Sequence, residues 1–158
     1  MGIPALPIDQ LIQSYLLCCI AEAKSPRTIE WYRANLTRFS QFLKDQGLSL
    51  FITDIGADEA RSFILHLQNN VKRWESCPTI KDTKGLSPSS IQGYARSIKA
   101  FWSWLTAEGY IESNSMARLK LPKVPQKIVA TFSPEQVQKL LGALDPRKPS
   151  DFRDYVII

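Results

Sequence analysis

Hydroxyl and guanidinium side chains gather at the starts of two segments that share one layout. The first reads SPRTIEWYR (residues 25–33) and the second reads SPSSIQGYAR (residues 87–96). Each begins with Ser-Pro and continues through an apolar residue and a tyrosine to an arginine. Hydroxyls, guanidinium groups and the free amides of a helix N-terminus all donate hydrogen bonds to phosphate oxygens. The pattern favours a contact with nucleic acid, and ordinary helix capping beside a solvated basic face stays open as the alternative.

The spacing of apolar residues predicts that each segment opens a helix. In the first, Ser25 is the N-cap, Pro26 takes the first helical position, and an apolar stripe continues to a terminal Gly47. In the second, Ser87 or Ser89 is the N-cap, and apolar residues recur on one side at about 100° per residue. This second helix carries no acidic residue from position 85 to position 107. Its polar side is therefore expected to be basic and exposed.

Four further helical segments frame these two. Apolar periodicity predicts them over residues 9–22, 58–67 and 134–144, and residues 151–158 begin another apolar element. The third helix of the chain is expected to extend toward Trp74. Residues 75–85 contain Pro, Gly and polar side chains and are predicted to form a loop, and a short turn follows at 112–119. No convincing strand pattern appears, which predicts an all-α fold.

Composition limits the kind of protein. The chain has 158 residues, a net charge of +5 and 44% hydrophobic residues, enough apolar side chains for a folded core. No apolar run approaches the roughly 18 residues that span a bilayer. The first residues lack the features of a signal peptide, and Leu6 stands where a myristoylation signal needs Ser or Thr. We expect a cytoplasmic protein, nucleoid-associated if it binds DNA, with no membrane partner.

Metal sites and catalytic motifs are not predicted. The cysteines Cys18, Cys19 and Cys77 show no C-x-x-C spacing, and His66 is the only histidine. We expect the cysteines to be small core residues and His66 to be a partly buried helix residue. The sequence contains no nucleophile elbow, phosphate-binding loop or dinucleotide fingerprint. We therefore predict no catalytic residues, no cofactor, no metal and no small-molecule ligand.

A basic stretch separates the two parts of the chain. Arg118, Lys120, Lys123 and Lys127 follow one another without an acidic residue between positions 112 and 135. A flexible basic strap beside a helical domain suits contact with a phosphate backbone. The predicted organisation is a domain over residues 1–118, a basic linker over 119–130, and the start of a second domain over 131–158.

Three stretches, 25–47, 52–67 and 86–123, together resemble the N-terminal core-binding domain of tyrosine recombinases, the phage-integrase and Xer-like enzymes. The family's Thr, Tyr and Leu-x-x-Phe-x-x-Phe-Leu pattern is matched by Thr28, Tyr32, Leu36, Phe39, Phe42 and Leu43. Its later aromatic cluster, glycine and I-x-x-N-P turn are matched by Trp102, Trp104, Gly109, Ile111 and Asn114. Ser115 replaces the proline of that turn, and the loop around residues 69–85 is longer than usual. Residues 131–141 resemble the first helix of the family's catalytic domain.

The resemblance implies a fold and a partner. It implies a small orthogonal bundle of four to five helices, the SAM-like core-binding domain, which forms half of a clamp around double-stranded DNA. The second and fourth helices approach the major groove, and the linker follows the DNA backbone. The DNA-binding residues that the resemblance implies are Ser25, Arg27, Thr28, Arg33, Ser87, Ser89, Ser90, Gln92, Arg96, Lys99, Lys120, Lys123 and Lys127. Other recombinase protomers are expected partners of the full-length parent protein.

The family's catalytic set is absent from these residues. It comprises two arginines, a His-x-x-Arg motif and a tyrosine nucleophile, and the first arginine is expected shortly after Ile158. Tyr155 precedes that position and is not assigned as the nucleophile. We expect an N-terminal portion of a tyrosine-type DNA strand-transferase that performs no strand exchange alone. Replacing Arg96 or Lys99 is expected to weaken DNA binding without lowering stability.

One alternative belongs to a different class. A helical protein-interaction domain without a DNA role would use an exposed apolar patch containing Trp102 and Trp104, with Trp104 only partly buried. A complete enzyme on this chain is a third reading, which the missing motifs disfavour.

Overall fold

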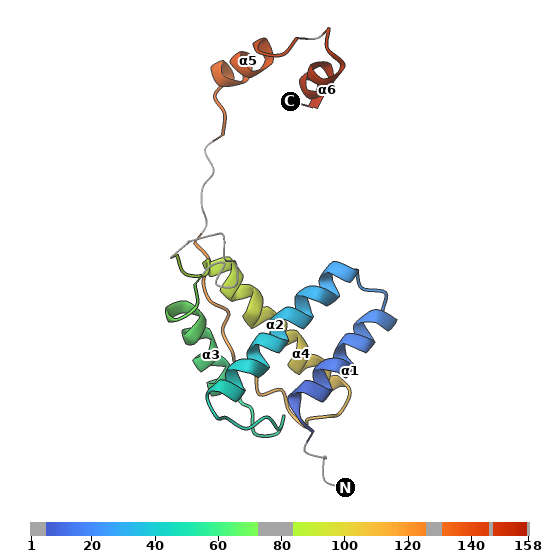
Figure 1. Cartoon of the computed structure of the whole chain (residues 1–158), viewed down its shortest axis with the longest axis vertical. Coiled ribbons are helices and arrows are strands. Elements are labelled where there is room, and N and C mark those ends of the chain that lie inside the picture. Colours follow the sequence, from blue (N-terminus) through green and yellow to red (C-terminus); the bar gives the residue numbers. More distant parts are fainter. Residues whose placement is uncertain (1–5, 73–83, 126–130, 146, 158) are drawn as a thin grey trace. The chain divides into compact units, whose positions relative to one another are not determined.

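The chain folds into helices joined by turns and extended segments (Figure 1). The structure, a computed structural model, describes residues 6–72, 84–125, 131–145 and 147–157. It divides the chain into two compact units, Met1–Pro125 and Gln126–Ile158. The helices are α1 (Ile8–Ala21), α2 (Pro26–Asp45), α3 (Ala57–Asn69), α4 (Pro88–Ala107), α5 (Pro134–Gly142) and α6 (Pro149–Ile157). Across these ranges the only β-type pairings are isolated bridges, so the all-α prediction is confirmed.

The starts and ends of α2 and α4 follow the predicted capping chemistry. The Thr28 amide donates to the Ser25 hydroxyl over 3.2 Å, and the Ser90 amide donates to the Ser87 hydroxyl over the same distance. Each hydroxyl satisfies one of the amides that a helix N-terminus leaves unpaired. Both helices end before a glycine with positive φ, 64° at position 47 and 75° at position 109. Ser87, rather than Ser89, is therefore the N-cap of α4.

Helices α2 and α4 cross in the middle of the first unit (Figure 1). At the crossing the Asn35 side-chain amide donates to the Ser97 hydroxyl over 2.8 Å, and both residues are buried. The hydroxyl in turn donates to the Gly93 carbonyl. A buried polar group is costly unless it finds such a partner, so this pair fixes which residues of the two helices meet.

Helices α1 and α3 complete the core of the first unit. The Phe39 and Phe63 rings lie 5.1 Å apart and join α2 to α3. The ring of Tyr15 in α1 lies 5.3 Å from the Tyr32 ring. The pKa of the Tyr15 hydroxyl is raised, chiefly by burial. The fully buried large side chains include Ile8, Leu11, Leu16, Leu36, Phe39, Leu43, Ile52, Phe63, Leu67, Ile98, Phe101 and Trp102.

Several sequence expectations can be compared with these contacts. His66 is half-buried and Cys19 is buried, as predicted, but Cys18 is only half-buried. Ile20, one of the periodic apolar residues of 9–22, is 55% exposed. Helix α3 stops at Asn69 and residues 70–72 are not helical, so the expected extension toward Trp74 is wrong. Trp74 and Cys77 themselves lie outside the described residues. Trp102 is fully buried against Phe39 and Phe101. The exposed patch predicted to contain Trp102 is therefore wrong for that residue.

The second unit consists of two short helices. Ser133 caps α5 by accepting from the Gln136 amide over 3.3 Å, as predicted. Its apolar stripe finds no core, because none of the residues of α5 or α6 is buried. No helix among the described residues is long and apolar enough to cross a membrane.

Candidate nucleic-acid interface

The N-terminal ends of α2 and α4 lie on the same side of their crossing. Trp31 of α2 packs on Gly93 of α4, and Asn35 bonds Ser97 four residues later in each helix. The two helices therefore run in the same direction through the contact. An added Cβ at Gly93 would lie 3.3 Å from the Trp31 ring, which explains a glycine in mid-helix. Figure 1 shows the two helices diverging upward from this contact. The sequence therefore brings its two Ser-Pro starts to one end of the unit.

Neither of these helix starts carries an acidic residue. The first turn of α1 contains Asp9, and that of α3 contains Asp58 and Glu59. Such acids offset the partial positive charge that the helix dipole places at an N-terminus. The first turns of α2 and α4 have none. Their N-terminal ends therefore keep a positive potential.

Several of the predicted site cations form no ion pair with described residues. Elsewhere in the unit Lys44 lies 2.6 Å from Asp9, and Arg61 lies 2.5 Å from Asp58. At the start of α2, Lys24 directly precedes the N-cap Ser25 and is paired with Glu22. By contrast, five predicted site residues are exposed and make no ion pair or hydrogen bond with other described residues: Arg27, Arg33, Arg96, Lys120 and Lys123.

The predicted site hydroxyls gather at the same helix starts. Ser25 lies 2.8 Å from the Thr28 hydroxyl. Ser87 lies 2.9 Å from the Ser89 hydroxyl and 2.8 Å from that of Ser90. Ser25 and Ser87 thus serve first as helix caps. Ser89 and Ser90 are exposed and can turn their hydroxyls outward.

Lys99 and Gln92 occupy different surroundings from those expected. The Lys99 ammonium donates to the carbonyls of Met116, Ala117 and Leu119 over 3.0, 3.1 and 2.9 Å. An ammonium has three donors, so all of them are used. The Gln92 amide donates to the Pro122 carbonyl over 3.0 Å. The prediction that Lys99 lies on an exposed face is wrong, because the chain folds back over that side of α4.

The returning segment carries the basic residues that follow it. Along residues 114–122 the contacts on α4 step backward, from Ser103 to Lys99 to Gln92. The segment therefore runs antiparallel to α4 and reaches its N-terminal end, with Lys120 and Lys123 exposed beside it. The structure divides the units after Pro125, so residues 119–125 of the expected linker belong to the first unit. Lys127 lies outside the described residues.

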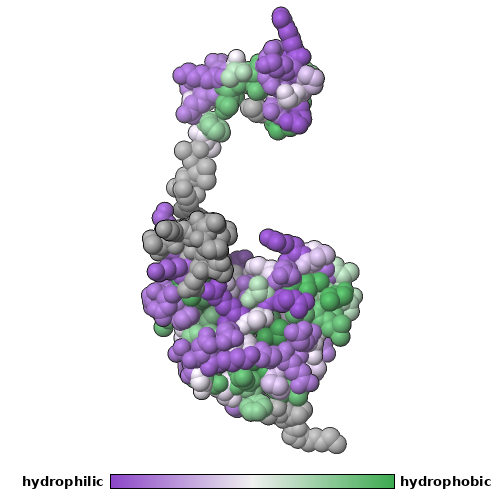
Figure 2. Space-filling view, in the orientation of Figure 1, coloured by the Kyte–Doolittle hydropathy of each residue, from purple (hydrophilic) through white to green (hydrophobic). Residues whose placement is uncertain are grey.

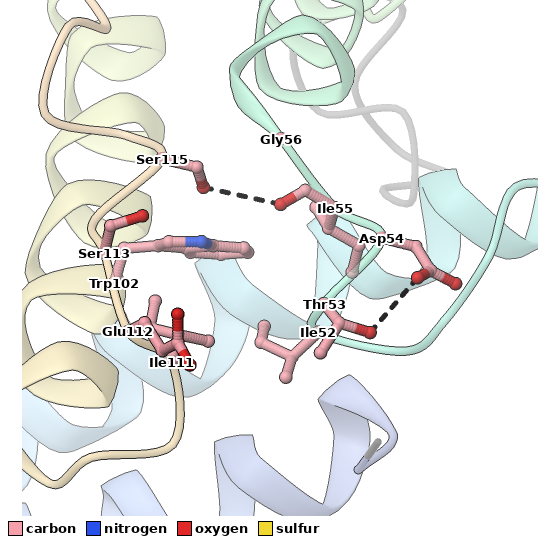
Figure 3. A pocket seen from close by; sticks show the side chains of 10 residues that line it. All are labelled: Ile52, Thr53, Asp54, Ile55, Gly56, Trp102, Ile111, Glu112, Ser113 and Ser115. Atoms are coloured by element: carbon pink, nitrogen blue, oxygen red, sulfur yellow. Dashed lines mark hydrogen bonds between the residues drawn. The ribbon is translucent and has the colours of Figure 1, made fainter. Parts of the chain in front are cut away.

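A pocket of about 430 Å³ lies at the C-terminal ends of the same helices (Figure 3). It lies between residues 52–56, which follow α2, and residues 111–115, which follow α4, with the Trp102 side chain between the two segments. Its charged side chains are the carboxylates Asp54 and Glu112. The sign of these charges is unsuited to phosphate. The two ends of the crossed helices are thus opposite in charge.

The model of the phage integrase SAM-like domain matches residues 13–121, well over half of the chain. The chain belongs to this family. The resemblance to tyrosine recombinases seen in the sequence is thereby confirmed.

Relatives of this SAM-like domain chain are tyrosine recombinases. XerC of Oceanobacillus iheyensis is 27% identical over 139 residues, covering 88% of this chain and 41% of the relative. XerD of Lacticaseibacillus casei is 30% identical over 126 residues, covering 80% and 37%. The chain thus spans less than half the length of these relatives. The integrase from mycobacterium phage Brujita has the same fold, with a TM-score of 0.57 at 19% identity over 89% of this chain and 41% of that chain.

Sequence reasoning missed one residue at the cationic end of the SAM-like domain. Trp31 is 41% exposed and lies on Gly93 between the two helix starts. It adds a flat aromatic surface beside Arg27. Gly93 within the predicted helix was the available signal. A glycine inside a helix lowers its stability, so its presence indicates that a neighbouring side chain packs closely there.

Proposed function

We propose that the first unit binds double-stranded DNA through the N-terminal ends of α2 and α4 and the basic segment that follows. The observation that carries the proposal is the distribution of charge. Two helix starts without acids in their first turns lie at one end of the unit, and five predicted site cations there make no ion pair with described residues. Elsewhere in the unit, Lys44 and Arg61 are paired with carboxylates. Helix N-terminal amides, hydroxyls and guanidinium groups donate hydrogen bonds that phosphates and base edges accept.

The contacts divide by chemistry. Arg27, Arg33, Lys120 and Lys123 supply phosphate contacts, with Lys127 extending the series along the chain. Ser89 and Ser90 donate from the start of α4. Arg96 and Trp31 lie nearest the crossing and can reach base edges in a major groove, where arginine bonds guanine and apolar groups contact the thymine methyl. Ser25, Ser87 and Thr28 act by holding the helix starts in place.

Fluorescence anisotropy with duplex DNA at several salt concentrations tests the proposal. Binding is expected to weaken as salt rises, because each neutralised phosphate releases counterions and contributes about −0.9 to the slope of log K against log salt. Each of the variants Arg27→Ala and Arg96→Ala should make that slope shallower by up to about 0.9.

Arg61→Ala is the matched control. It removes the same charge from α3, where Arg61 is paired with Asp58, and should leave the slope unchanged. Absent binding at low salt, or equal effects of Arg61→Ala and Arg96→Ala, would contradict the proposed interface.

The larger function follows from the family. We propose that the chain is the DNA-clamping portion of a site-specific tyrosine recombinase, a DNA strand-transferase acting in integration or recombination in the cytoplasm. The strand-transfer chemistry is assigned to residues outside this chain. Purified chain should therefore bind a DNA target without nicking it, and cleavage by these 158 residues would contradict that assignment.

One observation favours a second role, contact with another protein, which in the parent would be another protomer. Leu17 and Ile20 are 68% and 55% exposed, and Figure 2 shows hydrophobic residues gathered over the C-terminal half of α1. Beside Leu17 lies a groove of about 420 Å³ lined in part by Trp104 and Tyr110. Among the residues that the structure describes, the buried Trp104 indole nitrogen has no hydrogen-bond partner. Size-exclusion chromatography with and without DNA tests this role, and Leu17→Glu should abolish any association it detects.

A further inference from the structure

We infer that Lys99 and Gln92 are positioning residues, which clamp residues 116–122 onto α4 and thereby place the basic segment at the DNA-binding end. The inference rests on the proposed function only in that the placed lysines are taken to bind DNA. The clamp itself follows from side-chain contacts within the first unit.

Lys99 holds the first half of the segment. Its ammonium meets three carbonyls that converge within one turn, those of Met116, Ala117 and Leu119. The turn begins at Asn114, whose side chain accepts from the Met116 amide over 2.9 Å. The Met116 and Leu119 side chains are buried in the core. Apolar anchors thus fix one side of the turn, and the ammonium neutralises the carbonyl dipoles on the other.

Gln92 holds the second half of the segment. Its amide reaches the Pro122 carbonyl, two turns of α4 before Lys99. Pro122 has no amide hydrogen, so its carbonyl is the one backbone group through which a side chain can bond this residue. Beyond it the chain continues with Lys123, which is exposed. Two contacts on one helix face therefore set both the direction and the end point of the segment.

The clamp accounts for the unusual polar side of α4. An acidic residue at position 92 or 99 would place a carboxylate against backbone carbonyls and repel them. Arg96 lies between these two positions along the helix, is exposed, and forms no bond with other described residues. Two basic residues of α4 thus have different roles: Lys99 binds the backbone of residues 116–119, and Arg96 is available to DNA.

The test compares Lys99→Met with Arg96→Met, which remove the same charge from the same helix. Amide hydrogen exchange is measured at Ala117 and Leu119, whose amides donate to Asn114 and Met116 carbonyls. Lys99→Met should speed exchange at both by about tenfold or more, because the turn loses the three hydrogen bonds from the ammonium. Arg96→Met should leave exchange unchanged and make the slope shallower by about 0.9.

Gln92→Met supplies an independent variant should Lys99→Met not fold. It should lower the heteronuclear NOE of Lys120 and Lys123, which reports faster motion, and weaken DNA binding several-fold by releasing these lysines. Unchanged exchange in Lys99→Met, or an unchanged NOE in Gln92→Met, would overturn the clamp. Faster exchange in a chain that binds no DNA would uphold the clamp and refute the proposed function.

Discussion

Helices α4 and α5 begin with the same chemistry and lie in different surroundings. Each starts with Ser-Pro, and each serine hydroxyl accepts a hydrogen bond from the amide three residues on, over 3.2 Å in α4 and 3.3 Å in α5. Each carries an apolar stripe. Seven residues of α4 are buried, and none of α5 is.

The contrast separates what starts a helix from what keeps it folded. A serine cap contributes about 1 kcal/mol, and a helix as short as α5 is marginal in water without packing. Burying one large apolar side chain contributes roughly 1.5–3 kcal/mol, and α4 buries several. We therefore expect the first unit to unfold as one cooperative body, with the helices of the second unit opening independently of it.

The largest effect is expected from removing a core ring. Phe101 is fully buried beside Trp102 and Tyr15, so Phe101→Ala should lower the free energy of unfolding by about 3–5 kcal/mol. Leu141→Ala removes an apolar side chain of the unburied α5 and should leave the main unfolding transition unchanged. Urea unfolding followed by tryptophan fluorescence measures both. A comparable loss in Leu141→Ala would mean that the two units share a core.

Sequence periodicity predicted the inner side of α4 and could not predict its outer side. The stripe of Ile91, Ile98, Phe101 and Leu105 follows from spacing alone, and each of these residues is buried. What covers the opposite side depends on where a segment about twenty residues later returns. That contact is non-local, because it requires the turn at Asn114 to bring three carbonyls onto Lys99.

The candidate site shows the same limit. The caps Ser25 and Ser87 were predictable, since each hydroxyl bonds an amide within its own first turn. Their meeting at one end required the buried pair of Asn35 and Ser97, which sequence patterns treat as ordinary polar positions. Trp31 lies between the two helix starts because the same crossing brings it onto Gly93. Local signals thus identify the donors, and the helix crossing assembles them.

The second-largest effect is expected from breaking the buried Asn35–Ser97 pair. Helix α5 has no buried residue and so no equivalent pair. Asn35→Ala removes the buried hydrogen bond between α2 and α4 and should cost about 1–3 kcal/mol of unfolding free energy. Gln138→Ala, at an exposed position of α5, should cost nothing measurable in the same transition. A double-mutant cycle of Asn35→Ala with Ser97→Ala should show coupling of at least about 0.5 kcal/mol. Strict additivity would mean that the pair does not fix the crossing.

A smaller effect is expected from the caps. Ser87→Ala removes the acceptor for the Ser90 amide and should cost about 1 kcal/mol of the stability of the first unit. Ser133→Ala makes the same chemical change in α5 and should reduce helicity by circular dichroism without moving the main transition. Equal shifts of the melting temperature in the two variants would show that α5 folds together with the first unit.

The smallest expected effect is a pH dependence at Asp9, matched in the second unit by Glu135. Burial acts to raise the pKa of Asp9, but hydrogen bonds from Lys44 and Ser40 outweigh it and hold the pKa below its ordinary value. A lowered pKa in the folded state means that the unfolded chain binds the proton more tightly. The contribution is therefore present above the unfolded pKa of about 4 and is lost as pH falls through the folded value.

Because the Asp9 side chain is half exposed, that contribution should stay below about 1 kcal/mol. The melting temperature of the wild-type chain should exceed that of Asp9→Asn at pH 7, and the difference should shrink as the solution is acidified below about pH 4. The pKa of Glu135 is also lowered, chiefly by the Ser133 hydroxyl, but this bond lies within one helix start. Glu135→Gln should leave the melting temperature unchanged at every pH. Asp9 joins α1 to α2, so only its titration should reach the stability of the whole first unit.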